Sequence, residues 1–129
     1  MARREVLPEF IAIRVPTRDR RGRILPDRRR QQWIQRLKRF LLNDLGIIGM
    51  EKDQVEGLWR GEYDLAADSF QVVTEGCLII RCYCSMEQLK TFTERGEELL
   101  VEMGMALDQD AMAYETREGL IILYTTARE

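Results

Sequence analysis

One stretch, residues 75–85, constrains the fold of this chain more than any other. It reads Glu-Gly-Cys-Leu-Ile-Ile-Arg-Cys-Tyr-Cys-Ser and has the apolar density of a buried β-strand. Ser85 and Gln88 stand three residues apart at the start of the helical pattern Met86–Met103, which is the spacing of a capping box. A strand that runs directly into a capped helix is half of a βα unit, so the chain must combine both kinds of element.

The flanking segments supply the elements that fit around this unit. Residues 9–15 alternate as a first strand that Pro16 ends, because proline cannot donate to a sheet ladder. A helix is predicted from about residue 27 to 44, with Asp27 as its N-cap and Gly46 as its stop. Gly104 is predicted to stop the second helix. The remaining expectations are a linker at 46–53, strands at 55–63 and 69–74 around a turn at 64–68, and a terminal hairpin of 108–116 with 119–126.

The order β-α-β-(β)-β-α-β-β predicts an α+β fold on the ferredoxin-like split β-α-β plan. In that plan a mostly antiparallel sheet carries two helices on one face, with an added hairpin. The 129 residues are a normal length for one domain, so we expect a single α+β domain over 1–129. Within it, the basic segments 1–8 and 17–25 are expected to be flexible.

The central strands assign residues to the two faces of the sheet. Ile11, Ile13 and Val15 are expected to face the helices, together with Leu78, Ile80, Cys82 and Cys84. The opposite, open face is then also largely apolar, which is unusual for a sheet face exposed to water. Its expected members are Phe10, Ala12, Arg14, Cys77, Ile79, Arg81 and Tyr83, with Trp59 and Leu123 added.

Composition excludes several kinds of chemistry. The chain has no histidine, so it lacks the usual base for Ser-His or Cys-His catalysis. Three cysteines are too few to complete a zinc quartet and favour buried, reduced thiols. No metal or cofactor is therefore expected. No apolar run approaches the length of a membrane span, and we expect a cytoplasmic protein without membrane association.

Charge divides the chain into a basic start and an acidic remainder. Residues 1–40 carry 13 Arg and Lys against 4 Asp and Glu, whereas the rest carries 7 against 18. The basic start could meet nucleic acid, another anionic partner, or the acidic part of a second copy. A loop that enters a helix N-terminus is also a natural phosphate site. The residues concerned are Arg18, Arg20, Arg21, Arg23, Arg28, Arg29 and Arg30.

Three functional hypotheses follow. The first is a non-enzymatic binding or regulatory protein that forms a homo-oligomer, a dimer or higher, through the open face. It would enclose an anionic or apolar small ligand near Arg14, Arg81, Tyr83 and Trp59. The second is nucleic-acid or phosphate binding through the arginines. The third is a small enzyme in which Glu75, at a dimer seam beside Tyr83, Arg81 and Trp59, is a desolvated carboxylate.

The chain resembles an uncharacterised family of small bacterial ferredoxin-like proteins. The resemblance rests on Trp33, on Gly57-Leu-Trp-Arg60, on Glu75, and on Asp108-Gln-Asp-Ala-Met112, and it follows most of the chain in order. It implies the ferredoxin-like fold and no particular activity, since that family has no assigned function.

Overall fold

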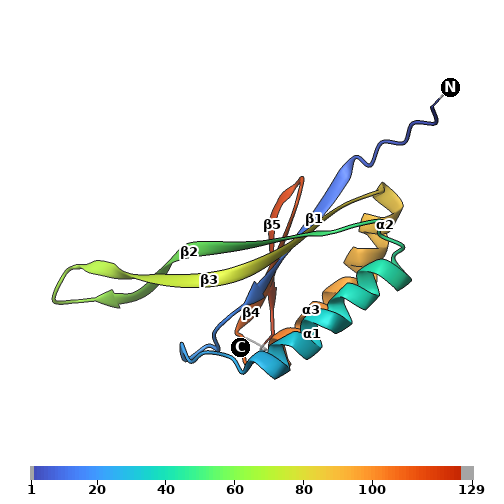
Figure 1. Cartoon of the computed structure of the whole chain (residues 1–129). Coiled ribbons are helices and arrows are strands. Elements are labelled where there is room, and N and C mark those ends of the chain that lie inside the picture. Colours follow the sequence, from blue (N-terminus) through green and yellow to red (C-terminus); the bar gives the residue numbers. More distant parts are fainter. Residues whose placement is uncertain (1, 126–129) are drawn as a thin grey trace.

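A computed structural model describes residues 2–125, except for the side chain of Trp59. Its centre is one antiparallel sheet with the strand order β2-β3-β1-β4-β5, which confirms the predicted α+β fold (Figure 1). The first strand and residues 77–84 are central neighbours, as expected. The strands are β1 (Glu9–Pro16), β2 (Glu51–Asp64), β3 (Ser69–Cys84), β4 (Ala111–Thr116) and β5 (Gly119–Tyr124).

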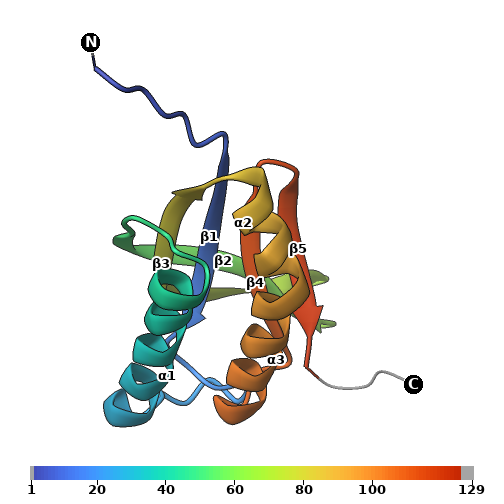
Figure 2. The same ribbon diagram turned by 90° about the vertical axis from the view of Figure 1, so that its right-hand side faces the viewer.

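Two helical rods lie side by side on one face of the sheet (Figure 2). The first is α1 (Asp27–Arg39), continued by the π-helical turn η1 (Phe40–Asp44). The second runs through α2 (Met86–Thr91), the π-helical turn η2 (Phe92–Gly96) and α3 (Glu97–Ala106). Both rods were predicted as uninterrupted helices, and each contains a π-helical turn.

The core forms between the rods and the helix-facing side of the central strands. Ile11, Ile13 and Ile80 have no exposed surface, and Cys82 and Cys84 are buried beside them, as the alternation predicted. Phe92 is also fully buried and stacks edge-on against Tyr114 with ring centroids 5.0 Å apart. The Tyr114 hydroxyl donates to Glu97 Oε2 at 2.5 Å, so this buried polar group is satisfied.

The sequence predicted the N-terminal cap of the second rod correctly and that of the first rod incorrectly. The capping box is present: Ser85 Oγ accepts from the Gln88 N–H at 3.1 Å, and Gln88 Oε1 accepts from the Ser85 N–H at 2.9 Å. The Asp27 cap is wrong, because α1 begins at Asp27 itself and Pro26 holds the cap position without a side-chain hydrogen bond. Asp27 instead places a negative charge in the first turn, which the helix dipole favours.

We expect Ser85→Ala to lower the free energy of unfolding by about 1 kcal/mol, because it leaves a first-turn N–H without its acceptor. Urea denaturation measures this change. Ser69→Ala, at the exposed start of β3, is the matched control and should change stability by much less. Equal losses for both variants would mean that the capping box contributes nothing specific.

Two further expectations about the C-terminal half are wrong. The second rod continues past Gly104 to Ala106, and Gly104 is instead required by packing. A Cβ at this position would lie 2.5 Å from Thr125 Cγ2 and 2.7 Å from Met112 Cγ. Leu123 pairs with Met112 and packs against the core, so it does not belong to the open face. Thr126, the last residue of the predicted hairpin, lies outside the described residues.

Strand β3 is longer than predicted and joins two expected strands into one. Its second half, Cys77–Cys84, pairs with β1, whereas its first half pairs only with β2. The 56–74 hairpin therefore extends away from the body as an arm (Figure 1). The strand register of the arm shifts between Arg60 and Tyr63, around Gly61, which marks a β-bulge or a similar irregularity.

The basic loop 17–25 makes defined contacts. A bridge joins Arg18 to Ile24, and Asp19 Oδ1 accepts from the N–H groups of Arg21 and Arg23 at 2.9 Å each. The flexibility proposed for segments 1–8 and 17–25 stays a prediction. Within residues 2–125, no helix is long and apolar enough to span a bilayer.

Candidate functional site

The open face is built by the side chains that alternate with the core residues. Arg14 lies opposite Ile79 on β3 and opposite Ala113 on β4, and Ala12 lies opposite Arg81. Strand β5 adds Leu120, Ile122 and Tyr124, each between 43 and 55% exposed. Among the described residues no helix covers this face (Figures 1 and 2). Ala12 and Ile79 were expected to be exposed on it, but the neighbouring side chains of the sheet bury them, so the apolar surface that meets solvent is that of Tyr83 and of strand β5.

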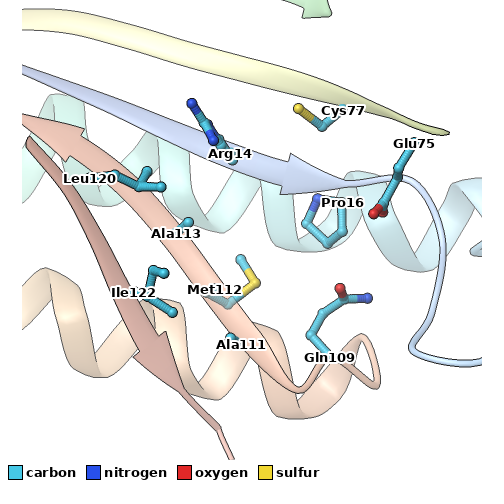
Figure 3. A pocket seen from close by; sticks show the side chains of 10 residues that line it. All are labelled: Arg14, Pro16, Glu75, Cys77, Gln109, Ala111, Met112, Ala113, Leu120 and Ile122. Atoms are coloured by element: carbon cyan, nitrogen blue, oxygen red, sulfur yellow. The ribbon is translucent and has the colours of Figure 1, made fainter. Parts of the chain in front are cut away.

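A pocket of about 250 Å³ opens on this face near the ends of β1 and β4. Figure 3 shows Arg14, Glu75 and Gln109 around a largely apolar floor. Ala111 and Ala113 leave room for the pocket, because larger side chains at these positions would fill it. The lining residues are Arg14, Pro16, Glu75, Cys77, Gln109, Ala111, Met112, Ala113, Leu120 and Ile122.

Glu75 is the acidic group of this pocket. It sits on β3 just before the strand meets β1, where Thr17 Oγ1 donates to the Gly76 carbonyl at 2.5 Å. Partial burial raises the pKa of the Glu75 carboxyl, and the positive charge of Arg18 only partly offsets this effect. The pocket therefore holds a carboxylate that lacks full hydration and would gain from a cationic group nearby.

One wall of the pocket is stiffened by contacts between distant segments. Gln109 Nε2 donates to the Arg18 carbonyl at 2.6 Å and to the Leu107 carbonyl at 2.9 Å. Arg20 adds an ion pair with Asp108, with 2.9 Å between Nε and Oδ1. The 17–25 loop is thus tied to the turn before β4, and the wall is set before any ligand arrives.

The structure does not bring the predicted site residues into one cluster. Arg14 and Glu75 share the pocket, but Arg81 and Tyr83 lie toward the opposite end of β3. There they line a second hollow of about 280 Å³ with Met50 and Glu51. Trp59 pairs with Val73 in the arm, and its side chain lies outside the described structure. The proposed grouping of Glu75 with Tyr83 and Arg81 is therefore wrong.

Four of the seven arginines proposed for phosphate binding make contacts within the chain. Arg18 Nη1 donates to the Gly22 carbonyl, and Arg30 Nε donates to the Pro16 carbonyl, both at 2.9 Å. Arg20 pairs with Asp108, and Arg23 pairs with Asp19 at 3.0 Å. These contacts hold the loop and the start of α1 in place. Nucleic-acid or phosphate binding through the seven arginines stays a prediction.

The three thiols differ in environment, which predicts selective labelling. All three cysteines are free, and burial raises the pKa of Cys82 to about 12 and that of Cys84 to about 11. Cys77 is only half-buried and borders the pocket.

We expect iodoacetamide at pH 8 to modify Cys77 first, since reaction requires an accessible thiolate. Peptide mass mapping reads the site, and early modification of Cys82 would contradict the buried assignment.

Sequence reasoning missed Gln109, Ala111, Ala113, Leu120 and Ile122. Alternation in the last hairpin places these small and apolar residues at every second position, which is a usable signal. What sequence did not indicate is that β4 lies beside β1, so that Ala113 comes to face Arg14. Pairing between distant strands is the information that assembles this pocket.

Comparison with known proteins gives similarity in structure only. No protein-family model matches the chain, and no curated protein does. A phage SAM lyase in complex with S-methyl-5'-thioadenosine matches with a TM-score of 0.60 and 16% identity, and the match covers 100% of this chain and 98% of the lyase chain. The apo state of a phage SAM lyase matches with a TM-score of 0.58 and 17% identity, covering 99% and 100%. The likeness at these identities is one of fold.

A third solved structure, the periplasmic divalent cation tolerance protein CutA from Archaeoglobus fulgidus, matches more weakly. Its TM-score is 0.41 at 12% identity, with 94% of this chain and 85% of that chain covered.

Proposed function

We propose that this protein binds a small molecule of the S-adenosylmethionine class in the open-face pocket, at a seam between copies of the chain. The observation that carries this proposal is that the Glu75 carboxylate and the Arg14 guanidinium line one pocket over an apolar floor. A sulfonium or ammonium group would sit against Glu75, and a ligand carboxylate against Arg14. An adenine ring would lie on the apolar strip of Leu120 and Ile122.

The similar fold of a SAM lyase that holds S-methyl-5'-thioadenosine supports this choice of ligand. The pocket volume supports the need for a second copy. About 250 Å³ is below the usual range of enclosed ligand sites, and this pocket is open to solvent. Another protein surface placed over it would exclude water and strengthen both charge contacts.

Isothermal titration with S-methyl-5'-thioadenosine and with S-adenosylmethionine tests the proposal. We expect saturable binding of both, and weakening of at least tenfold in Ala113→Phe, whose ring fills the floor. Gln31→Phe adds the same ring on the exposed side of α1 and should bind normally. Absence of binding at millimolar ligand, or equal binding by both variants, would overturn the proposal.

Cleavage of the bound sulfonium is a second candidate function, and the raised pKa of Glu75 favours it. In an elimination, the carboxylate would take a proton from the carbon next to the one that carries sulfur. The C–H electrons would form the double bond, and the C–S pair would leave on a neutral thioether. Chromatographic detection of S-methyl-5'-thioadenosine from S-adenosylmethionine distinguishes this candidate from binding alone, which leaves the ligand intact.

A further inference from the structure

Strand β2 forms one edge of the sheet along its whole length. It pairs with β3 on one side, and among residues 2–125 no strand pairs with its other side. The outward N–H and C=O groups of such a long edge are a template for another strand. In the arm, residues 56–74, no other element packs against the two strands (Figure 1). An isolated two-stranded hairpin is only marginally stable in water, so the arm gains from further strands.

The side chains in the middle of this edge are self-complementary. Glu56, Leu58 and Arg60 alternate along β2, so they lie on the face of the arm that continues the helix-covered side of the sheet. Leu58, between the two charges, is 68% exposed. In the described part of the chain, neither Glu56 nor Arg60 makes an ion pair within 4.0 Å. Arg60 lies over the Phe70 ring at 4.5 Å, and a stacked guanidinium still presents N–H donors at its edge.

A two-fold axis at Leu58 matches these charges. When two identical edges meet around a two-fold axis, the strands run antiparallel, and residues equally far from the centre lie opposite each other. With Leu58 at the centre, Leu58 meets its own copy and each Glu56 meets an Arg60. The other positions between 55 and 61 carry no charge. A centre one residue away sets Leu58 against a charged side chain, and a centre two residues away sets Glu56 against Glu56 or Arg60 against Arg60.

The irregularity after Arg60 limits the pairing to this segment. The register of β2 with β3 shifts between Arg60 and Tyr63, and such a shift bends the strand and interrupts regular pairing. A longer ladder between the two copies would bring Asp53 of one close to Asp64 of the other. Because the regular edge ends before Tyr63, these like charges stay outside the paired segment.

We infer that two copies of this chain join through their β2 edges, antiparallel about Leu58, over residues 55–61. The two arms then form four adjacent strands in the order β3-β2-β2-β3, and a Leu58 contact lies between two Glu56–Arg60 pairs. The paired segment shares no residue with the lining of the open-face pocket, so this inference does not depend on the proposed function.

A disulfide trap tests the pairing. Leu58→Cys in a Cys77→Ser background should form a covalent dimer under mild oxidation at micromolar concentration, because opposed residues of antiparallel strands have Cα atoms about 4.5–5.5 Å apart, within reach of a disulfide. Val72→Cys in the same background is the matched control, since Val72 lies on the same face and is 71% exposed. Its copies would lie three strand spacings apart, roughly 14 Å, and should cross-link at least tenfold more slowly. Non-reducing electrophoresis measures both rates. Equal rates, or no dimer from Leu58→Cys, overturn the inference.

Charge reversal tests the register. Added to the Leu58→Cys background, Glu56→Lys and Arg60→Glu should each slow cross-linking at least tenfold, because each sets like charges opposite at two places in the dimer. The combined Glu56→Lys/Arg60→Glu change exchanges the two charges and should restore most of the lost rate. Glu94→Lys, exposed on the second rod, should leave the rate unchanged. A combined variant as slow as its parents overturns the pairing about Leu58.

Discussion

Phe92→Ala should lower the free energy of unfolding by about 3–5 kcal/mol, the largest effect we expect from one substitution. Phe92 has no exposed surface and joins the second rod to both the sheet and the first rod. Its ring lies edge-on to Tyr114 at 5.0 Å and tilted to Phe40 at 6.4 Å. Alanine would leave a cavity at the point where these three elements meet, and the surrounding backbone is regular structure that cannot easily collapse into it.

Chemical denaturation at fixed protein concentration measures the loss, because self-association would otherwise shift the midpoint. Leu42→Ala is the matched control: it removes apolar atoms from the same class of π-helical turn, at a side chain that is 43% exposed. We expect it to change stability by under about 1 kcal/mol. A loss below about 1.5 kcal/mol for Phe92→Ala would mean that the ring is not the centre of the core.

Sequence predicts most of this fold because its elements have strong local periodicity. The alternation of β1 and of Cys77–Cys84 assigned the helix-facing residues correctly, and the capping box located the start of the second rod. The wrong predictions concern positions at which tertiary packing, and not local pattern, determines the structure. Gly104 resembles a helix stop, but it is small because Thr125 and Met112 pack against it.

The faces of the last hairpin show why local pattern is insufficient. Ile121, Ile122 and Leu123 are all apolar, so alternation does not say which of them face the helices. The pairing of Leu123 with Met112 decides this, since a slip of one residue would exchange the two faces. The same pairing brings Ile122 opposite Ala113 and builds the pocket floor. The site depends on strand adjacency, which a single sequence does not encode locally.

The separation of Glu75 from Tyr83 has a similar cause. The enzyme hypothesis grouped both residues in one site. They are eight residues apart on an extended β3, which places them roughly 26 Å apart along the strand. Glu75 instead shares the lining of one pocket with Arg14, because β1 runs antiparallel to β3 and ends beside the segment that carries Glu75. The charge that acts on its carboxyl is that of Arg18. The carboxylate was identified from sequence, but its partners came from the sheet.

Glu75→Gln should act in opposite directions on stability and on ligand binding. Burial raises the pKa of Glu75 in the folded protein, so folding disfavours its charged form. The stability that this group contributes is present below its unfolded pKa and is lost as the pH rises through the raised folded value. At pH 8 the neutral glutamine avoids this cost, and the variant should melt at a higher temperature than wild type. At pH 3 the difference should vanish.

Binding should move the other way, because glutamine cannot neutralise a cationic ligand. Loss of one charge-assisted contact is worth about 1.5–3 kcal/mol, or roughly 10- to 100-fold in the dissociation constant for S-adenosylmethionine. The groups that act on Glu75 are Arg18 and Cys77, with Arg14 across the pocket, and none of them is altered by the substitution.

Glu118→Gln, in the exposed β4–β5 turn, should change neither property. If the Glu75→Gln variant is more stable than wild type but binds the ligand more weakly, the carboxylate serves ligand binding at a cost in stability. For a purely structural residue, stability and affinity would fall or rise together. Unchanged affinity in Glu75→Gln would remove Glu75 from the site.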